Sequence, residues 1–421
     1  MRRTRGSGYH EDVTEIVRGL PQPADFQAPP GQTERARWAE ADAVARPARV
    51  ARLRETLAAN GVDAYFGIRS ENVRYLTGFI LDDGEDKVSG NSGRCLISGD
   101  EIVVTADSRY RLQAQAQCAG ARVAPVTYDL AATWPELLAS IGAKRVAVEA
   151  GAISHKQWQD LAAAAPHVEL VEAGTWVERQ RATKEPAEIE RIRSACAVAD
   201  RALASIIRRI KPGRTERELA MALEWEIRTG GAEALAFGVA CLAGPNAALP
   251  HGSPSASEAC VGQVLLFDFG AMVDGYRSDM TRTLFVGTPS SRDGEIYEIV
   301  AAAQLAAIER LRAGLRGEMP LPTDKETDAA ARAVIEAAGY GEKFGHGLGH
   351  GIGLATHESP SCNRLARGDA LPSPSVFSVE PGIYLDGETG VRIEDLVLFD
   401  ASNADLELLT HFPRDIVVVG V

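Results

Sequence analysis

Residues 262–286 read GQVLLFDFGAMVDGYRSDMTRTLFV and decide the fold of the C-terminal half of the chain. Two β-prone runs flank Asp274-Gly275, a dipeptide typical of tight hairpin turns, so the segment predicts an antiparallel hairpin. Asp268 and Asp279 are equidistant from a four-residue loop 272–275, which would make them direct cross-strand partners with Cβ atoms roughly 5 Å apart. A turn centred on Asp274-Gly275 would instead make them diagonal neighbours. Either register places two carboxylates on one face.

A second hairpin repeats this plan over residues 377–399, FSVEPGIYLDGETGVRIEDLVLF. Glu380 and Glu394 lie equally far from Gly387 in the turn, so they should also face each other. Like charges opposite each other destabilise a half-buried strand pair, and two such pairs predict a compensating cation. The alternative is that the four acids point to solvent from edge strands, and it would have to hold for both hairpins.

A segment rich in glycine and histidine lies between the hairpins, GHGLGHGIGLATHESP at 345–360. Because glycines alternate with larger residues, a period of two places His346 and His350 on one face and bare backbone on the other. Bare backbone lets another element, or a ligand, approach closely. A phosphate-binding loop is the competing interpretation, but the spacing fits neither G-x-G-x-x-G nor G-K-[ST], so nucleotide binding is not expected.

Four carboxylates and one imidazole match a site for two divalent cations. This donor set suits Mn²⁺ best, with Co²⁺ and Zn²⁺ as further candidates, and two such ions about 3.5–4 Å apart can activate a shared water. His350 is the predicted nitrogen ligand. His251 precedes the first hairpin in a Gly/Pro-rich loop of the kind that often serves a site, although it could also be an ordinary loop histidine. Arg392 shares the strand face of Glu394 and is either a guanidinium beside the metals or an exposed strand arginine.

The composition argues against several kinds of partner and structural site. The chain has 421 residues, with 45 Lys+Arg against 58 Asp+Glu, and its net charge of −13 makes nucleic acid an unexpected partner. Six scattered cysteines contain no C-x-x-C pair, which predicts reduced core thiols rather than a zinc ribbon or a disulfide scaffold. We find no apolar leader and no long apolar run, so we expect a cytoplasmic protein with no membrane partner.

The sequence divides into three parts. Residues 1–45 are polar and punctuated by proline, and are predicted to form a loosely attached N-terminal extension. Residues 46–178 alternate helical stretches with short strands, which predicts an α/β domain. Residues 179–421 group helices at 215–229, 294–315 and 325–338 beside the hairpins, which predicts an α+β catalytic domain. The predicted fold class of the whole chain is α+β.

These motifs together resemble the pita-bread metallopeptidases of family M24, specifically the aminopeptidase P and prolidase branch. SENVRYLTGF at 70–79 and TADSRYRLQAQ at 105–115 resemble the creatinase-type N-terminal domain of that branch. The resemblance implies a duplicated α/β catalytic domain behind a smaller creatinase-like domain. It implies five metal ligands, which are Asp268, Asp279, His350, Glu380 and Glu394. It also implies substrate-binding and proton-transfer roles for His251 and His357, a proline-ring contact for His346, and a position beside the metal ligands for Arg392.

The resemblance implies metal-dependent hydrolysis of N-terminal Xaa-Pro bonds, as in aminopeptidase P, on peptides with proline at the second position. Glu380 would handle the proton of the attacking water. Four alternatives stay open: an Xaa-Pro dipeptidase (prolidase), a metal-free creatinase-type hydrolase, a lyase acting on a small sulfonium substrate, and a binding protein that has lost catalysis.

The resemblance also implies a homodimer or a higher homo-oligomer, in which the loop 81–93 reaches a partner's cleft. The chain departs from the family pattern in the extension 1–45 and in the segments 315–330 and 366–381, which could reshape the rim of the cleft.

Overall fold

The computed structural model describes residues 20–81 and 90–420. The described chain forms two compact units, one of residues 32–181 and one that joins residues 20–31 to 182–420. The helix expected from about residue 46 already starts at Gln32, as α2 (Gln32–Ala59). Its first turns are polar and bury only Trp38 before residue 46, so their composition resembles that of an exposed arm. Most of the loop 81–93, namely 82–89, lies outside the described residues.

The N-terminal unit is built on a six-stranded mixed sheet with the order β4-β3-β2-β1-β5-β6. Its strands are β1 (Ala64–Gly67), β2 (Cys95–Ser98), β3 (Ile102–Ala106), β4 (Arg122–Pro125), β5 (Arg145–Val148) and β6 (Glu169–Glu172). Its further helices are α3 (Ser70–Thr77), α4 (Arg111–Gln117), α5 (Leu130–Ile141), α6 (His155–Ala164) and α7 (Trp176–Ala182). The Phe66 and Trp134 rings meet edge to face at 4.8 Å in the core of this unit.

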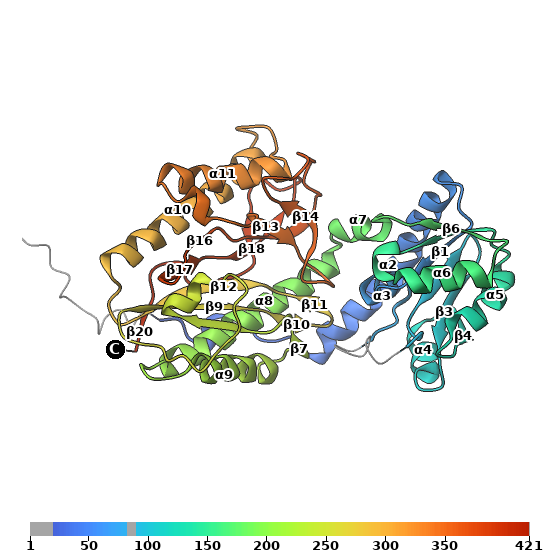
Figure 1. Cartoon of the computed structure of the whole chain (residues 1–421), viewed down its shortest axis with the longest axis horizontal. Coiled ribbons are helices and arrows are strands. Elements are labelled where there is room, and N and C mark those ends of the chain that lie inside the picture. The colour runs from blue at the N-terminus through green and yellow to red at the C-terminus, as the bar shows by residue number, and fades with distance from the viewer. Residues whose placement is uncertain (1–19, 82–89, 421) are drawn as a thin grey trace, which may run out of the picture. The chain divides into compact units, whose positions relative to one another are not determined.

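The C-terminal unit contains four long helices, α8 (Pro186–Ile206), α9 (Glu216–Thr229), α10 (Ser291–Leu315) and α11 (Asp324–Ala337). The last three agree with the predicted ranges to within three residues, because their starts are marked by N-caps: Thr215 and Thr323 form capping boxes with Glu218 and Glu326, and Ser290 caps α10. Figure 1 shows α10 and α11 side by side on the C-terminal half of this unit.

The first hairpin has one of the two predicted registers and excludes the other. Strand β9 (Gln263–Phe269) pairs with β12 (Met280–Val286), and β10 (Ala271–Val273) pairs with β11 (Tyr276–Arg277). The turn contains only Asp274 and Gly275, both at positive φ (46° and 77°). Asp268 therefore lies opposite Thr281. Direct pairing of Asp268 with Asp279 is wrong, and the diagonal alternative is confirmed.

The second hairpin has the predicted register. Strand β15 (Ser375–Val379) pairs with β18 (Asp395–Phe399), and β16 (Gly382–Leu385) pairs with β17 (Thr389–Arg392). Val379 lies opposite Asp395 and Gly382 lies opposite Arg392, so both ladders are centred on Gly387. The positions between them, Glu380 and Glu394, face each other.

The glycine-rich segment forms a short central strand, β13 (Gly349–Gly351), between β14 (Glu358–Cys362) and β15. A Cβ atom on Gly349 would collide with the carbonyl of Ser378, and one on Gly351 with the carbonyl of Ser359. The predicted close approach of another element is therefore confirmed, and the glycines let β13 lie between its two neighbours. The remaining strands of the unit are β7 (Ala234–Leu235), β8 (Ala240–Ala243), β19 (Glu407–Leu408) and β20 (Val418–Val419).

Residues 20–31 pack on the C-terminal unit and are not loosely attached. Arg201 on α8 donates hydrogen bonds to the carbonyls of Pro23 and Phe26, at 2.6 and 3.3 Å. The Phe26 ring stacks on Phe412 with a centroid separation of 6.5 Å.

All six cysteines are free, and five of them are buried. Among the described residues, no helix has the length and apolar character needed to span a bilayer.

Candidate metal centre

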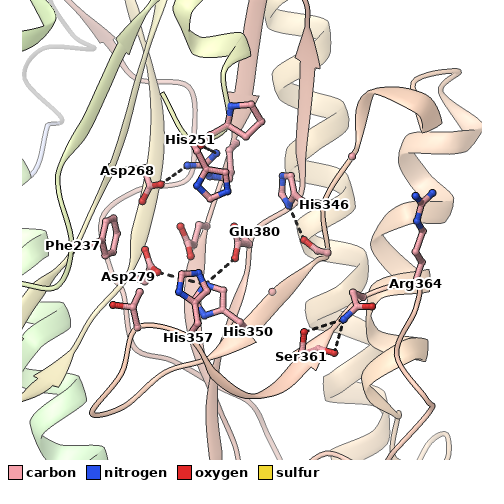
Figure 2. A pocket seen from close by; sticks show the side chains of 18 of the residues that line it. Phe237, His251, Asp268, Asp279, His346, His350, His357, Ser361, Arg364 and Glu380 are labelled. Carbon is pink, nitrogen blue, oxygen red and sulfur yellow. Dashed lines mark hydrogen bonds and ion pairs between the residues drawn. The ribbon is translucent and has the colours of Figure 1, made fainter. Parts of the chain in front are cut away.

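One pocket of about 670 Å³ in the C-terminal unit gathers all of the residues singled out in the sequence (Figure 2). It is lined by His251, Asp268, Asp279, His346, His350, His357, Glu380, Arg392 and Glu394. The two hairpins supply the acids, the glycine-rich segment supplies three histidines, and the loop before β9 supplies His251. The pattern of paired acids predicted from sequence therefore converges in three dimensions.

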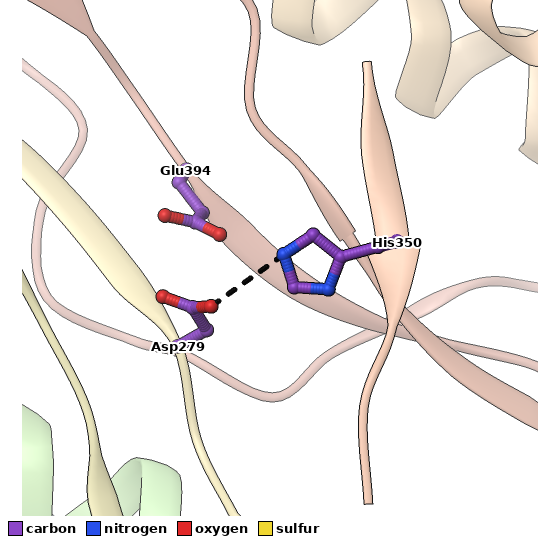
Figure 3. Close-up of side chains that lie close together, drawn as sticks. All are labelled: Asp279, His350 and Glu394. Carbon is purple, nitrogen blue, oxygen red and sulfur yellow. Dashed lines mark ion pairs between the residues drawn. The ribbon is translucent and has the colours of Figure 1, made fainter. Parts of the chain in front are cut away.

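Three of these side chains form a compact ligand cluster (Figure 3). One ligand atom each from Asp279, His350 and Glu394 lies within 4.8 Å of the others. The Nε2 atom of His350 is 3.7 Å from Asp279 Oδ2 and 3.4 Å from Glu380 Oε1. One imidazole and several carboxylates at these separations could hold a metal ion.

The chemistry of the carboxylates fits bound cations. Asp268 Oδ1 and Glu394 Oε1 are buried and have no hydrogen-bond partner among the described residues. Burial, and then repulsion from Glu394 and Asp268, raises the pKa of Asp279 well above its usual range. Burial and repulsion from Glu380 raise the pKa of Glu394 in the same way, and burial raises that of Glu380. Divalent cations would use the unpaired oxygens and offset the repulsion.

The protonation state of His350 also fits a ligand role. Its Nδ1 lies 3.1 Å from the carbonyl oxygen of Gly351, and because a carbonyl only accepts, Nδ1 carries the proton. Burial lowers the pKa of His350, so the ring is neutral at pH 7. The lone pair of Nε2 is left facing the carboxylates, as metal ligation requires.

Thr281 and Arg392 connect the two hairpins through hydrogen bonds to each other and to two of the acids. The Thr281 hydroxyl donates to Glu394 Oε2 at 2.7 Å and accepts from Arg392 Nε at 2.8 Å. Arg392 Nη2 donates to Asp268 Oδ2 at 2.6 Å. Arg392 is 3% exposed, so the exposed-arginine alternative is wrong. These bonds orient one carboxylate from each hairpin.

Tyr384 connects Arg392 to the histidine predicted to contact proline. Its hydroxyl accepts from Arg392 Nη1 at 2.9 Å and lies 2.9 Å from His346 Nε2. His346 Nδ1 is 2.8 Å from the Gly347 carbonyl and therefore donates to it, so Nε2 accepts from Tyr384. Both nitrogens are engaged and burial lowers the pKa of His346, so the neutral ring can offer only its face and carbon edges to a ligand.

Several residues at the site were not identified from the sequence. Among them are Phe237 and Arg364, which line the pocket, and Thr281 and Tyr384, which form hydrogen bonds to residues that line it. A signal existed for two of them, because Thr281 follows Asp279 by two positions and Tyr384 follows Glu380 by four. Even spacings along a strand place side chains on one face. Phe237 and Arg364 lie in loops, where sequence periodicity gives no such indication.

Comparisons with known proteins agree with this geometry. The sequence matches Metallopeptidase family M24 over residues 190–401 and the Creatinase/Prolidase N-terminal domain over 49–183. This chain belongs to metallopeptidase family M24. It is 35% identical to the uncharacterized peptidase YqhT of Bacillus subtilis, over 87% of this chain and 99% of that protein. It is 39% identical to the Xaa-Pro dipeptidase of Pyrococcus furiosus, over 56% of this chain and 65% of that protein.

Two solved structures show the same M24 architecture. The Xaa-Pro dipeptidase from Bacillus anthracis superposes with a TM-score of 0.80 at 32% identity, covering 89% of this chain and all of that one. The X-Pro aminopeptidase from Thermotoga maritima MSB8 superposes with a TM-score of 0.76 at 32% identity, covering 88% and 99%. The predicted pita-bread domain behind a creatinase-like domain is confirmed, and this M24 protein is a hydrolase of the exopeptidase class.

Proposed function

We propose that this M24 protein is an Xaa-Pro dipeptidase that uses two divalent ions, with Mn²⁺ as the first candidate. The similarity to proteins named Xaa-Pro dipeptidase supports this activity more than the aminopeptidase P activity expected from the sequence. The aminopeptidase remains the second candidate, supported by the likeness to the Thermotoga maritima structure.

The ions would be held by five residues, Asp268, Asp279, His350, Glu380 and Glu394. When bound, such ions polarise a carbonyl and lower the pKa of water. Glu380 is the proposed base: Ser378 Oγ donates to its Oε1 at 2.9 Å, and burial raises its pKa, so this carboxylate holds a proton more readily than an ordinary glutamate does.

Three histidines would handle the substrate. His251 and His357 line the pocket beside the acids, where their ring N–H groups could donate to the substrate carbonyl as negative charge develops. The neutral ring of His346, with both nitrogens engaged, offers a largely apolar surface to a proline ring. Proline has no N–H, so an apolar wall leaves no donor of the substrate unsatisfied.

The position of Arg364 favours a dipeptide over a longer peptide as substrate. Two arginines line the pocket, and the guanidinium of Arg392 is already bound to Thr281, Tyr384 and Asp268. Arg364 is exposed at the pocket wall, and within the described ranges it makes no ion pair. A dipeptide carries a free carboxylate next to its proline ring, and a guanidinium can bind a carboxylate through two parallel hydrogen bonds.

The test compares Ala-Pro, Ala-Pro-amide and Ala-Pro-Ala at matched concentrations with Mn²⁺-loaded protein. We expect Ala-Pro to be hydrolysed fastest. Arg364→Met should raise KM for Ala-Pro about tenfold, the equivalent of 1.4 kcal/mol, and leave the amide unchanged. Arg367→Met, which removes an exposed arginine of the same loop that does not line the pocket, is the matched control. Faster hydrolysis of Ala-Pro-Ala would favour the aminopeptidase, and no hydrolysis of any substrate would refute both.

A further inference from the structure

A buried ion pair lies just outside the pocket, where none of the roles above uses it. Lys184 Nζ is 3.1 Å from Glu358 Oε2, and the two side chains are only 1% and 4% exposed. Glu358 follows His357 directly in the chain and begins strand β14. Burying two charges costs desolvation that their attraction repays only in good geometry, so such a pair is weak support for a role in stability alone.

Lys184 contacts the first residue of β14 and the residue just before β15, the two strands that flank β13 and its proposed ligand His350. Its backbone N–H donates to the carbonyl of Pro374, directly before β15, at 2.8 Å. Its side chain reaches Glu358 at the start of β14. In the ladders, Gly351 of β13 lies opposite Glu358 on one side and Phe377 on the other. One residue therefore connects the two neighbours of β13 at the same end of that strand.

Glu358 in turn folds the loop 352–357 that carries His357. Its Oε1 accepts from the backbone N–H of Ala355 at 2.8 Å. The carboxylate also covers Gly353, where an added Cβ would lie 2.9 Å from Oε2 and 3.0 Å from Oε1. The loop places the His357 ring against His350 at a centroid separation of 4.1 Å (Figure 2).

We infer that Lys184 is a positioning residue of this site: through Glu358 it holds the loop 352–357, and thereby sets where the His357 imidazole meets the substrate. The part of this inference that concerns substrate rests on the proposed function. Lys184 is not among the described residues that line the pocket, so its effect on turnover would be indirect.

Two measurements on Lys184→Met test the inference. Amide hydrogen exchange of the 352–358 segment should become at least tenfold faster, because the carboxylate that holds this loop loses its charged partner. The loop keeps its other contacts, such as the hydrogen bond from the Arg277 N–H to the Gly353 carbonyl at 2.9 Å. With Mn²⁺ bound, kcat for Ala-Pro should fall about 10- to 100-fold, the loss expected when a group that contacts the substrate is displaced by about 1 Å. KM should change less than threefold.

Further variants separate positioning from stability. In Lys184→Met/Glu358→Gln no charge is left unpaired and the Gln oxygen can still accept from Ala355, so kcat and slow exchange should partly recover. Gly353→Ala keeps both charged partners but displaces the Glu358 carboxylate, so it should also speed exchange of 352–358 and lower kcat. It replaces Lys184→Met as the test if Lys184→Met does not fold. Arg49→Met breaks a buried pair with Asp42 in the N-terminal unit and should lower the unfolding temperature without changing kcat.

The outcomes are distinguishable. Wild-type exchange and a kcat within twofold of wild type in both Lys184→Met and Gly353→Ala would overturn the inference. If the wild-type protein hydrolyses no Xaa-Pro peptide but exchange of 352–358 still rises in Lys184→Met, the proposed function fails and the anchoring of the loop stands.

Discussion

Asp279→Asn should stabilise the metal-free protein and destabilise the metal-loaded one. Without metal, burial and neighbouring carboxylates raise the pKa of Asp279, Glu380 and Glu394. The folded state then retains protons that the unfolded chain releases above pH about 4, so the free energy of unfolding falls as pH rises from about 4 toward the raised pKa values. The Asn variant lacks one of these groups, so in the metal-free state it should unfold at a higher temperature than wild type, with a gap that widens between pH 5 and 8.

Metal reverses the order. At a free Mn²⁺ concentration 100 times Kd, each ion that binds only the folded state adds about 2.7 kcal/mol, so two ions add about 5 kcal/mol. For a unit of this size that corresponds to a rise of about 10–20 °C in the unfolding temperature. Asp279→Asn removes a ligand of the compact cluster and should keep less than half of this rise.

Scanning calorimetry of chelated and Mn²⁺-loaded protein at pH 5, 6, 7 and 8 measures both effects. Asp160→Asn serves as control, because Asp160 is an exposed acid paired with Lys156 on α6 and should behave as wild type in both states. Two results would refute the assignment of these carboxylates to a cation site. One is a lower unfolding temperature at pH 8 for the metal-free Asn variant than for the metal-free wild type. The other is an unfolding temperature of the wild-type protein that does not change when Mn²⁺ is added.

Three further substitutions test the surroundings of the site. Thr281→Val removes the hydroxyl that orients Glu394 and should weaken Mn²⁺ binding about 10- to 100-fold by calorimetric titration, while Thr281→Ser should stay near wild type. Tyr384→Phe leaves His346 Nε2 and Arg392 Nη1 without their shared partner and should lower kcat/KM for Ala-Pro about tenfold, the equivalent of one lost buried hydrogen bond; an unchanged value would contradict the connection. Gly349→Ala should cost about 1–3 kcal/mol or more in urea unfolding, because a Cβ atom at this position would collide with the Ser378 carbonyl, and wild-type stability would contradict that packing.

The sequence predicted the acids of the site because strand periodicity is a local property. The spacing of Glu380 and Glu394 about Gly387 was sufficient to predict that they face each other. The first hairpin was harder, since the length of its turn depends on Asp274 adopting positive φ, which residue type alone does not determine.

Other features depend on contacts between distant segments and leave no periodic signal. The ion pair of Lys184 with Glu358 joins residues 174 positions apart. The stacking of Phe26 on Phe412 likewise joins two distant segments, and nothing in the local sequence of residues 20–31 indicates it, so the sequence predicts a loose arm there. Arg364 lies in an irregular loop and became a candidate only once the pocket was formed.

The packing of residues 20–31 on the C-terminal unit has a consequence for biosynthesis. The ribosome releases Phe26 long before Phe412, so this segment has to wait through synthesis of the N-terminal unit and nearly all of the C-terminal one before its docking surface exists. Arg201 on α8 is made earlier, but until Phe412 follows, the Phe26 ring lacks its stacking partner. A truncated chain that starts at residue 182 would lack residues 20–31, so the surface around Arg201 and Phe412 would stay exposed. We therefore expect it to be a poor substitute for the full chain in expression and crystallisation.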